Sequence, residues 1–243
     1  MKLHRSKYYM YGIHPCAAAL QNPMRQIDEI IYSSERLLEK FPPLPKPIKT
    51  RQADKAWFDK TLGSEAVHQG IAMRVSGLDP LGIDELKAFS HPNQLVIILD
   101  QVSDPHNVGA IIRTAAAFGA KALVMTDRHA PEETGVLAKS ASGALEIVPI
   151  MRYANLANAI QELKEAGFWI YGFAESGDQS LSNISFSGKV GLVMGAEGAG
   201  MRELTKKNCD FLIRLETTKE FSTLNVSNAA AIAMYQVFTK FTP

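Results

Sequence analysis

One arginine stands alone on the helix predicted from about Asn107 to Phe118, within the stretch DQVSDPHNVGAIIRTAAAFGA (residues 100–120). Apolar residues recur there at helical spacing, in a stripe that should face a core: Val108, Ile111, Ile112, Ala115 and Phe118. Arg113 points away from this stripe, among glycine and alanine, and is the only Lys, Arg, Asp or Glu between Asp104 and Lys121. Because solvated helix faces usually mix both charge signs, we expect something to pack against this face. A lone solvent-facing arginine is the alternative.

The start of this helix could bind an anion. Asn107 suits the N-cap position, and Gly109 lacks a side chain where the first turn has free N–H groups. Such a terminus, with Arg113 further along the helix, suits a backbone phosphate. Capping alone would explain the same two residues.

A second segment, VGLVMGAEGAGM (residues 190–201), is an apolar strand that runs into three glycines. Their spacing is GxxGxG, whereas the dinucleotide fingerprint is GxGxxG, so a Rossmann dehydrogenase is poorly supported. Glu197 within the loop would repel phosphate and suits a ligand that offers hydroxyls or cations. A tight turn between strand and helix is the alternative.

A third segment, EFSTLNVSNAAAIAMYQ (residues 220–236), gathers polar side chains at the start of an apolar helix. They are Thr223, Asn225, Ser227 and Asn228. Capping needs only one or two of them, so the surplus indicates hydrogen bonding to something else. Ordinary turn chemistry is the alternative.

The elements that carry these segments alternate between short apolar strands and helices from residue 94 onward. This alternation indicates an α/β fold with a parallel sheet covered on both faces, which binds ligands at the carboxyl ends of its strands. Strands are expected at 95–100, 122–126, 146–150, 168–174, 189–195 and 211–215, and helices at about 107–118, 131–141, 155–167 and 225–241.

The first part of the chain predicts a smaller mixed α/β unit. Helices are expected at 15–20, 35–41 and 53–63, and strands at 26–33 and in the second half of 67–77. We therefore expect a first domain at 1–76, a linker with a short helix at 77–92, and a second domain at 93–243.

Composition narrows the class of protein. The chain has 243 residues, 46% of them hydrophobic and 21% charged, which is enough for one or two cores. No apolar run approaches membrane-spanning length, and residues 1–12 lack the apolar core of a signal peptide, so we expect a cytoplasmic protein. Cys16 and Cys209 fit no metal-ligand spacing and should be reduced thiols.

The net charge of +1 is unevenly distributed. Residues 1–60 hold 11 Lys and Arg against 6 Asp and Glu, while residues 61–243 hold 15 against 19. A basic first segment could be an electrostatic footprint for nucleic acid. A solvated surface of mixed charge is the alternative.

Taken together, DPHNVGAIIRTAAAFGA, LVMGAEGAGM and STLNVSNAAA resemble the three motifs of the SpoU family of RNA ribose 2′-O-methyltransferases, in the knotted SPOUT superfamily. They occur in the family's order and roughly at its spacing. YGIHPCAAAL and VHQGIAMRV also resemble the ribosomal-protein-like substrate-binding domain of the rRNA guanosine methyltransferases in this family.

The resemblance implies a fold, a cofactor and partners. The fold would be a small ribosomal-protein-like α/β domain followed by a parallel-sheet catalytic domain with a C-terminal trefoil knot, which no local pattern predicts. The cofactor would be S-adenosylmethionine, and no metal would be needed. The partners would be RNA and a second copy of the chain, in an obligate homodimer that covers the face around Arg113.

The resemblance also implies the site residues. Asn107 and Arg113 match the first motif's active-site residues, Glu197 the second motif's acidic residue, and Thr223 and Asn225 the third motif's serine and asparagine. Arg113 would remove the proton of the ribose hydroxyl or stabilise the oxyanion. The cofactor would lie against Gly195, Ala196, Gly198, Leu215, Leu224 and Asn225.

One segment departs from the family pattern, which has Ile-Pro-Met-x-Gly before Ser-Leu-Asn. Here LETTKEFSTLN (residues 215–225) lacks both the proline and the glycine, and Glu216 and Glu220 add negative charge. The shape of the expected cofactor loop, and its affinity, are therefore open.

The expected reaction is 2′-O-methylation of a guanosine in large-subunit rRNA, and the alternatives are a tRNA ribose methyltransferase or a non-catalytic RNA-binding protein of the same fold.

Overall fold

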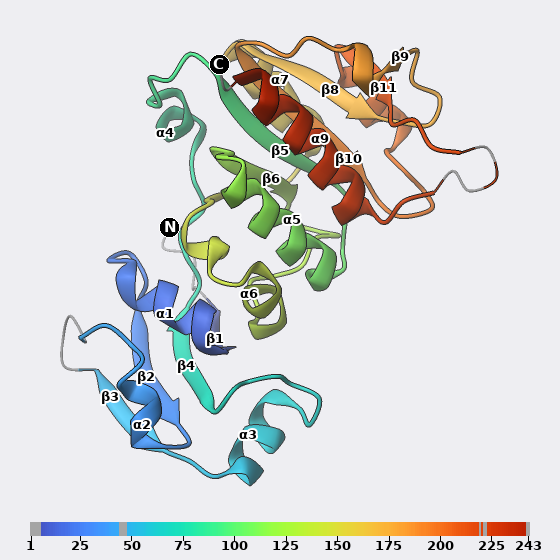
Figure 1. The fold of residues 1–243 in the computed structure, drawn as a ribbon. Coiled ribbons are helices and arrows are strands. Elements are labelled where there is room, and N and C mark those ends of the chain that lie inside the picture. The colour runs from blue at the N-terminus through green and yellow to red at the C-terminus, as the bar shows by residue number, and fades with distance from the viewer. Residues whose placement is uncertain (1–5, 44–47, 219, 221–222, 242–243) are drawn as a thin grey trace. The chain divides into compact units, whose positions relative to one another are not determined.

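The computed structural model describes residues 6–43, 48–218, 220 and 223–241 (Figure 1). Its contacts divide the chain into two units, one formed by residues 1–79 with 132–147 and the other by residues 80–131 with 148–243. The boundaries expected from the sequence keep residues 131–141 with the second domain, whereas this division by contacts places almost all of them in the first unit.

The first unit is a four-stranded mixed sheet in the order β1-β4-β2-β3. β4 pairs antiparallel with both β1 and β2, while β2 and β3 run parallel. Two of its strands, β1 and β3, are absent from the sequence prediction. The elements are β1 (Lys7–Tyr11), α1 (Ile13–Gln21), β2 (Ile27–Tyr32), α2 (Glu35–Leu38), β3 (Lys49–Gln52), α3 (Lys55–Leu62), β4 (Ile71–Ser76), α6 (Gly135–Ala141) and η1 (Ala144–Glu146).

A buried arginine anchors both ends of the 132–147 segment within the first unit. Arg25 forms ion pairs with Glu133 and with Glu146, whose side chains are also mostly buried. Between them, α6 packs closely on β1, since a Cβ on Gly135 would lie 2.3 Å from the carbonyl oxygen of Tyr9. The helix expected at 131–141 is present, but it begins only at Gly135, after the cap at Thr134, and no local signal connects it to β1.

The second unit contains a seven-stranded sheet in the order β7-β6-β5-β10-β8-β11-β9, and all its pairings are parallel. All seven residues of β5 and all five of β6 are buried, as expected for strands covered on both faces. The elements are α4 (Ile83–Lys87), β5 (Gln94–Asp100), α5 (Pro105–Ala117), β6 (Ala122–Thr126), β7 (Ile150–Tyr153), α7 (Leu156–Glu165), β8 (Phe168–Phe173), β9 (Gln179–Ser180), η2 (Leu181–Asn183), β10 (Lys189–Gly195), α8 (Glu203–Asn208), β11 (Phe211–Arg214) and α9 (Val226–Phe241).

Two predicted boundaries in this unit are wrong. The strand expected at 146–150 begins only at Ile150, and Glu146 is instead the last residue of the 3-10 helix η1. The helix expected from Asn107 begins at Pro105 and is capped by Asp104, whose carboxylate accepts a hydrogen bond from the His106 backbone N at 2.9 Å. Asn107 therefore lies in the first turn and is free for another role.

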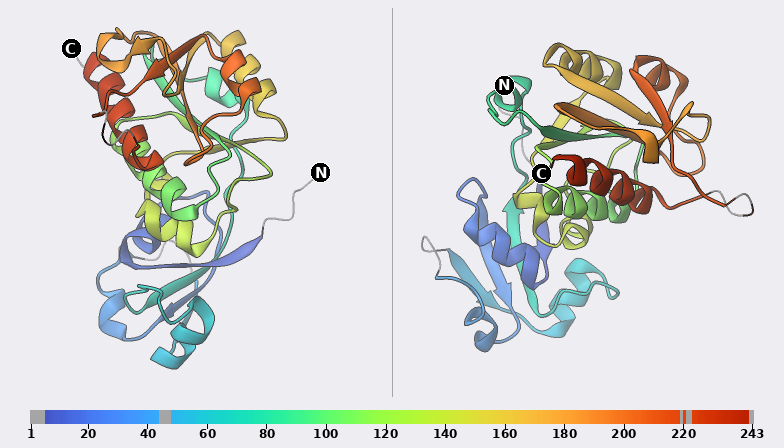
Figure 2. Two further views of the ribbon diagram at one scale, coloured as in Figure 1. Left: turned by 90° about the vertical axis from the view of Figure 1, so that its right-hand side faces the viewer. Right: turned by 45° about the horizontal axis from the view of Figure 1, so that its top comes forward.

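Helices α5 and α9 lie next to each other (Figures 1 and 2). Val108, Ile111, Ile112 and Ala115 are fully buried, as the apolar stripe predicts. Phe118 is only half-buried, because it follows the end of α5 and instead contacts Tyr235 and Phe238 of α9, at ring-centroid distances of 5.8 and 5.4 Å. Helix α9 thus packs along α5 and contacts the residue that follows its carboxyl end.

Candidate active site

Two central strands bring the first and second motifs to the same edge of the sheet. β5 and β10 are parallel neighbours, and their last residues, Asp100 and Gly195, stand opposite each other in the register. The first motif follows β5 and the glycine loop follows β10, so both leave the sheet at its carboxyl edge. This is the edge at which open α/β sheets bind ligands.

The glycine loop closes tightly on itself. The Ala196 N–H donates to the Gly200 carbonyl at 3.2 Å, and the Gly200 N–H donates to the Ala196 carbonyl at 2.8 Å. Gly195 has no room for a side chain, since a Cβ there would lie 2.2 Å from the Gly200 carbonyl carbon. A tight turn, one of the two readings of this segment, is therefore present, and it presents Glu197 to solvent.

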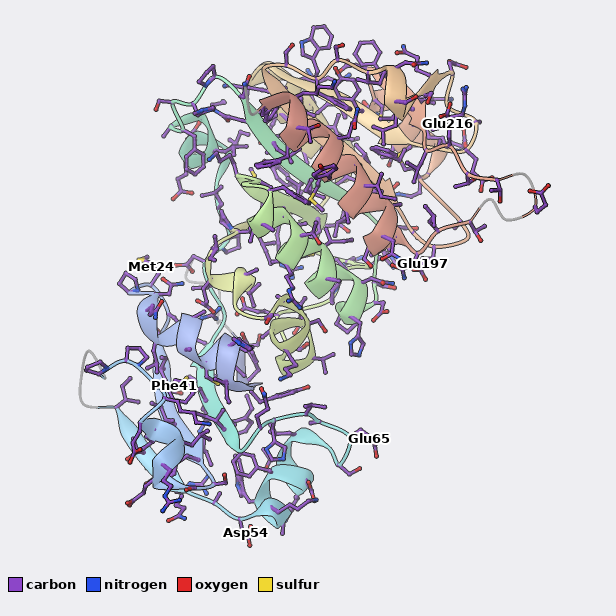
Figure 3. The ribbon with its side chains drawn as sticks, in the orientation of Figure 1. Met24, Phe41, Asp54, Glu65, Glu197 and Glu216 are labelled. Atoms are coloured by element: carbon purple, nitrogen blue, oxygen red, sulfur yellow. The ribbon has the colours of Figure 1, made fainter. Side chains whose placement is uncertain are left out.

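Glu197 joins all three motifs through hydrogen bonds. Its Oε1 accepts from Asn225 Nδ2 at 2.5 Å and from Asn107 Nδ2 at 3.2 Å. Asn225 Nδ2 also donates to Asn107 Oδ1 at 2.9 Å. We call Asn107, Glu197 and Asn225 the polar cluster; in Figure 3, Glu197 lies beside the beginning of α9. The cluster brings together Asn107 and Asn225, which are 118 residues apart in the sequence.

Asn225 has two roles at the start of α9. Its Oδ1 accepts from the Ser227 backbone N at 2.9 Å, the pattern of a helix cap, and from the Ser227 hydroxyl at 2.5 Å. Its Nδ2 donates to Asn107 and Glu197 in the polar cluster. Both readings of the third segment, capping and bonding elsewhere, are therefore realised by one asparagine.

A cavity of about 460 Å³ lies between the glycine loop and the segment that leads to α9. The predicted residues that line it are Gly195, Ala196, Glu197, Gly198, Leu215, Thr223 and Leu224. Asn225 lies outside this lining, in the polar cluster. The sequence prediction missed the wall formed by the last residue of β8 and the three residues after it, which are Phe173, Ala174, Glu175 and Ser176, and also missed Met201 and Lys206. Only the neighbouring positions of β8 and β10 in the sheet reveal this wall.

The loop that departs from the family pattern forms one side of this cavity. Leu215, Thr217, Thr223 and Leu224 line it. Glu216 and Glu220 are exposed, and neither belongs to the lining; Figure 3 labels Glu216. Lys219, Phe221 and Ser222 lie outside the described residues. The added carboxylates therefore do not face the cavity.

Arg113 lies apart from the polar cluster. It is exposed, and among the residues that the structure describes it has no hydrogen-bond or ion-pair partner. It lines a separate apolar groove of about 490 Å³ with Thr114, Ala117, Phe118, Ala231, Ile232 and Tyr235. Within one copy of the chain, the structure therefore joins the other two motifs to Asn107 but not to Arg113.

Three further features of the described residues concern metal ions, thiols and membranes. No group of three or more His, Cys, Asp or Glu in this part of the chain could hold a metal ion. Cys16 and Cys209 are both free thiols, as predicted. Burial raises the pKa of the Cys209 thiol to about 12. Within the same ranges, no helix is long and apolar enough to cross a membrane.

The fold and the cavity define an α/β protein with a small-molecule site at the carboxyl ends of its parallel strands. Residues 94–235 match the SpoU rRNA methylase family, and residues 9–81 match a family described as RNA 2′-O ribose methyltransferase substrate binding. The chain therefore belongs to the SpoU rRNA methylase family, which confirms the resemblance.

Three similar proteins illustrate the relationship. A 23S rRNA (guanosine-2′-O-)-methyltransferase RlmB from Pseudomonas putida is 35% identical over 235 residues, which cover 93% of this chain and 94% of that protein. A putative TrmH family tRNA/rRNA methyltransferase YacO from Bacillus subtilis is 40% identical over 72% of each chain. The crystal structure of the SpoU methyltransferase AviRb from Streptomyces viridochromogenes, in complex with AdoMet, has a TM-score of 0.81 at 20% identity and covers 96% of this chain and 90% of that one. At this identity, the likeness confirms the fold class.

Proposed function

We propose that this protein transfers a methyl group from S-adenosylmethionine to the ribose 2′-hydroxyl of a guanosine in 23S rRNA. The observation that carries the proposal is the polar cluster, in which one carboxylate joins the three motifs of a SpoU chain beside a cavity. The relatives named as 23S rRNA guanosine methyltransferases, similar over nearly the whole chain, support the choice of substrate.

The cavity fits the proposed cofactor. Its volume of about 460 Å³ lies in the usual range for small-molecule sites. Backbone groups of the glycine loop and the apolar side chains of Leu215, Leu224 and Met201 suit an adenine ring and an aliphatic chain. Glu175, Glu197 and Lys206 place both charge signs around a ligand that also carries both. The bound cofactor would supply an electrophilic methyl group.

We propose Gly195, Ala196, Gly198, Leu215, Leu224 and Asn225 as the cofactor-binding residues. Glu197, held by Asn107 and Asn225, would orient the ribose through its hydroxyls, since a carboxylate accepts hydrogen bonds. Thr223 would add a hydroxyl at the cavity wall. Arg113 would take the 2′-hydroxyl proton or stabilise the oxyanion that forms.

We also propose that two copies of the chain form a homodimer through the groove beside Arg113. This groove is apolar, and Ile232 and Tyr235 are 44% and 56% exposed there. Contiguous exposed apolar surface of this kind is typical of interaction sites. A second copy packed against it would exclude water around Arg113 and strengthen its electrostatic interactions. We further propose that the C-terminal region forms the trefoil knot of the family.

We propose that the N-terminal domain at 1–76 binds the RNA, and that a linker at 77–92 connects it to the catalytic domain at 93–243. The match to the substrate-binding family and the basic excess of residues 1–60 support this role. Because its substrate would be ribosomal RNA, we place the reaction in the cytoplasm.

The test is to map ribose methylation in rRNA from cells with and without this protein. We expect one guanosine of 23S rRNA to lose its 2′-O-methyl group in the cells that lack the protein. A tRNA position that loses its methyl group instead would support the tRNA alternative, to which the YacO relative's name also points. Calorimetry that gives no saturable heat with S-adenosylmethionine would support the non-catalytic RNA-binding alternative.

A further inference from the structure

A carboxylate that the proposed mechanism does not use lies under the glycine loop. Asp100 is the last residue of β5, and its side chain is fully buried. Its Oδ2 accepts the backbone N–H of Arg202 at 2.9 Å, and its Oδ1 accepts the Arg202 Nε–H at 2.7 Å. A single residue of the chain therefore satisfies both oxygens of a buried charge, which is otherwise costly to bury.

The position of this pair fixes both ends of the loop. Gly195, where the loop begins, is held in the sheet opposite Asp100. Arg202, where the loop ends, is held by the Asp100 carboxylate. The residues between them carry Glu197, the centre of the polar cluster. The loop is thus attached at its entrance and at its exit to the same residue of β5.

The same residue precedes the first motif. Gln101, directly after Asp100, has a φ of +60°, and Asp104 then caps the helix that carries Asn107. Asn107 and Glu197 therefore both follow strand ends that meet at Asp100, and the Asp100 carboxylate additionally holds the exit of the glycine loop. Their hydrogen bond, at 3.2 Å, depends on the relative placement of these two segments.

We infer that Asp100 and Arg202 are positioning residues that set the glycine loop, and through it Glu197, for cofactor binding and methyl transfer. This inference rests on the proposed function for its catalytic part. Its structural part, the immobilisation of the loop, stands independently. Asp100 is buried and therefore acts on the site only through the loop.

Asp100→Asn tests the inference with a minimal change of shape. Each carboxylate oxygen accepts from a separate donor on Arg202, so an amide in either orientation would turn its NH₂ group toward an N–H donor. One of the two hydrogen bonds must break. Arg202→Gln, at a side chain that is 45% exposed, removes the charge from the other partner without changing a buried residue.

Asp210→Asn is the matched control in the same unit. Asp210 Oδ2 accepts the backbone N–H of Ile170 at 2.8 Å, and its Oδ1 pairs with Lys164 Nζ at 2.7 Å. The substitution therefore creates the same clash of donors. Asp210 does not line the cavity and has no contact with the polar cluster.

The experiment measures three quantities on the full-length protein: amide hydrogen exchange of residues 196–201 without ligand, the Kd for S-adenosylmethionine by calorimetry, and kcat and KM for rRNA methylation. For Asp100→Asn and Arg202→Gln, we expect exchange in the loop to be about tenfold faster, and the Kd and kcat to worsen about tenfold, the equivalent of one lost net hydrogen bond. Asp210→Asn should leave all three within about twofold of the unmodified protein, on the same scale.

Two results would overturn the inference. One is loop exchange and cofactor Kd within about twofold of the unmodified protein in both test variants. The other is an equal loss in Asp210→Asn, which would mean a general loss of stability. If the unmodified protein binds no S-adenosylmethionine, the proposed function fails, while the exchange data still decide the positioning role.

Discussion

At the scale of single residues, Arg113 combines an exposed position with the absence of an ion-pair partner among the described residues. We expect Arg113→Ala to lower kcat by a factor of about 100 or more, the usual effect of removing a group that stabilises developing charge. The fold should be unaffected, because the side chain is exposed. Steady-state methylation assays and thermal unfolding would measure both effects.

Arg128→Ala is the control for this prediction, since Arg128 is an exposed arginine in the same unit outside the three motifs. It should retain the activity of the unmodified protein. Near-normal turnover of Arg113→Ala would remove Arg113 from the mechanism.

The two thiols give a prediction about pH. Burial raises the pKa of Cys16 and of Cys209, in the latter case to about 12, so both thiols are protonated at pH 8. We expect neither to react with a disulfide reagent at pH 8 in the folded protein, and both to react after unfolding, because the thiolate is the nucleophile.

The same pKa shifts affect stability. Above about pH 8.5, the unfolded chain loses thiol protons that the folded chain keeps, so the free energy of unfolding should fall as the pH rises. Urea unfolding of the Cys209→Ser variant and of the unmodified protein between pH 7 and 10 would measure this fall in the free energy of unfolding. An equal pH dependence in the two proteins would mean that Cys209 contributes nothing to it.

At the scale of elements, α5 and α9 together form the apolar groove. We expect a dimer in solution, and we expect Tyr235→Glu to shift it toward monomer because a charge would be buried at the interface. Light scattering at micromolar concentration gives the mass. Lys240→Glu, at the exposed end of α9, is the charge control. A monomeric mass for the unmodified protein would refute the dimer.

Arg25 tests the attachment of α6 and η1 to the first unit. Arg25→Met should lower the free energy of unfolding by about 3 kcal/mol or more, because it leaves the mostly buried carboxylates of Glu133 and Glu146 without the cation with which they pair. Lys7→Met breaks an exposed ion pair with Asp28 and should cost less than about 1 kcal/mol. Chemical denaturation would measure the difference, and similar losses in the two variants would contradict the buried network.

Sequence patterns predict the elements of the second sheet better than those of the first. The buried strands β5, β6 and β10 are largely apolar runs, which are typical of strands in a sheet covered on both faces. β3 consists of polar residues, with the sequence KTRQ, and therefore carries no apolar signal. The cap at Asp104 was missed because Asn107 is an equally suitable residue type, and only the cluster with Glu197 shows its different role.

At the scale of the whole molecule, the resemblance to the SpoU motifs predicts that the three segments form one site, and the parallel sheet predicts a ligand site at the carboxyl ends of its strands. The wall formed by residues 173–176 could not be predicted, since it depends on the position of β8 beside β10. The placement of residues 132–147 also could not, because Arg25 and its two carboxylate partners are more than 100 residues apart in the sequence. Such pairings arise from tertiary packing and leave no local pattern.

The measurement that tests the central claim most directly is methyl transfer by the purified full-length protein. Labelled S-adenosylmethionine is supplied with unmethylated 23S rRNA or, in parallel, with unmodified tRNA, and the labelled nucleotide is then identified. The account predicts label on the ribose 2′-oxygen of a guanosine in 23S rRNA, none on tRNA, and labelling of the rRNA that is slower by a factor of about 100 or more when Arg113→Ala replaces the unmodified protein. Label on a base or on tRNA alone, or no label with a correctly folded protein, would contradict it.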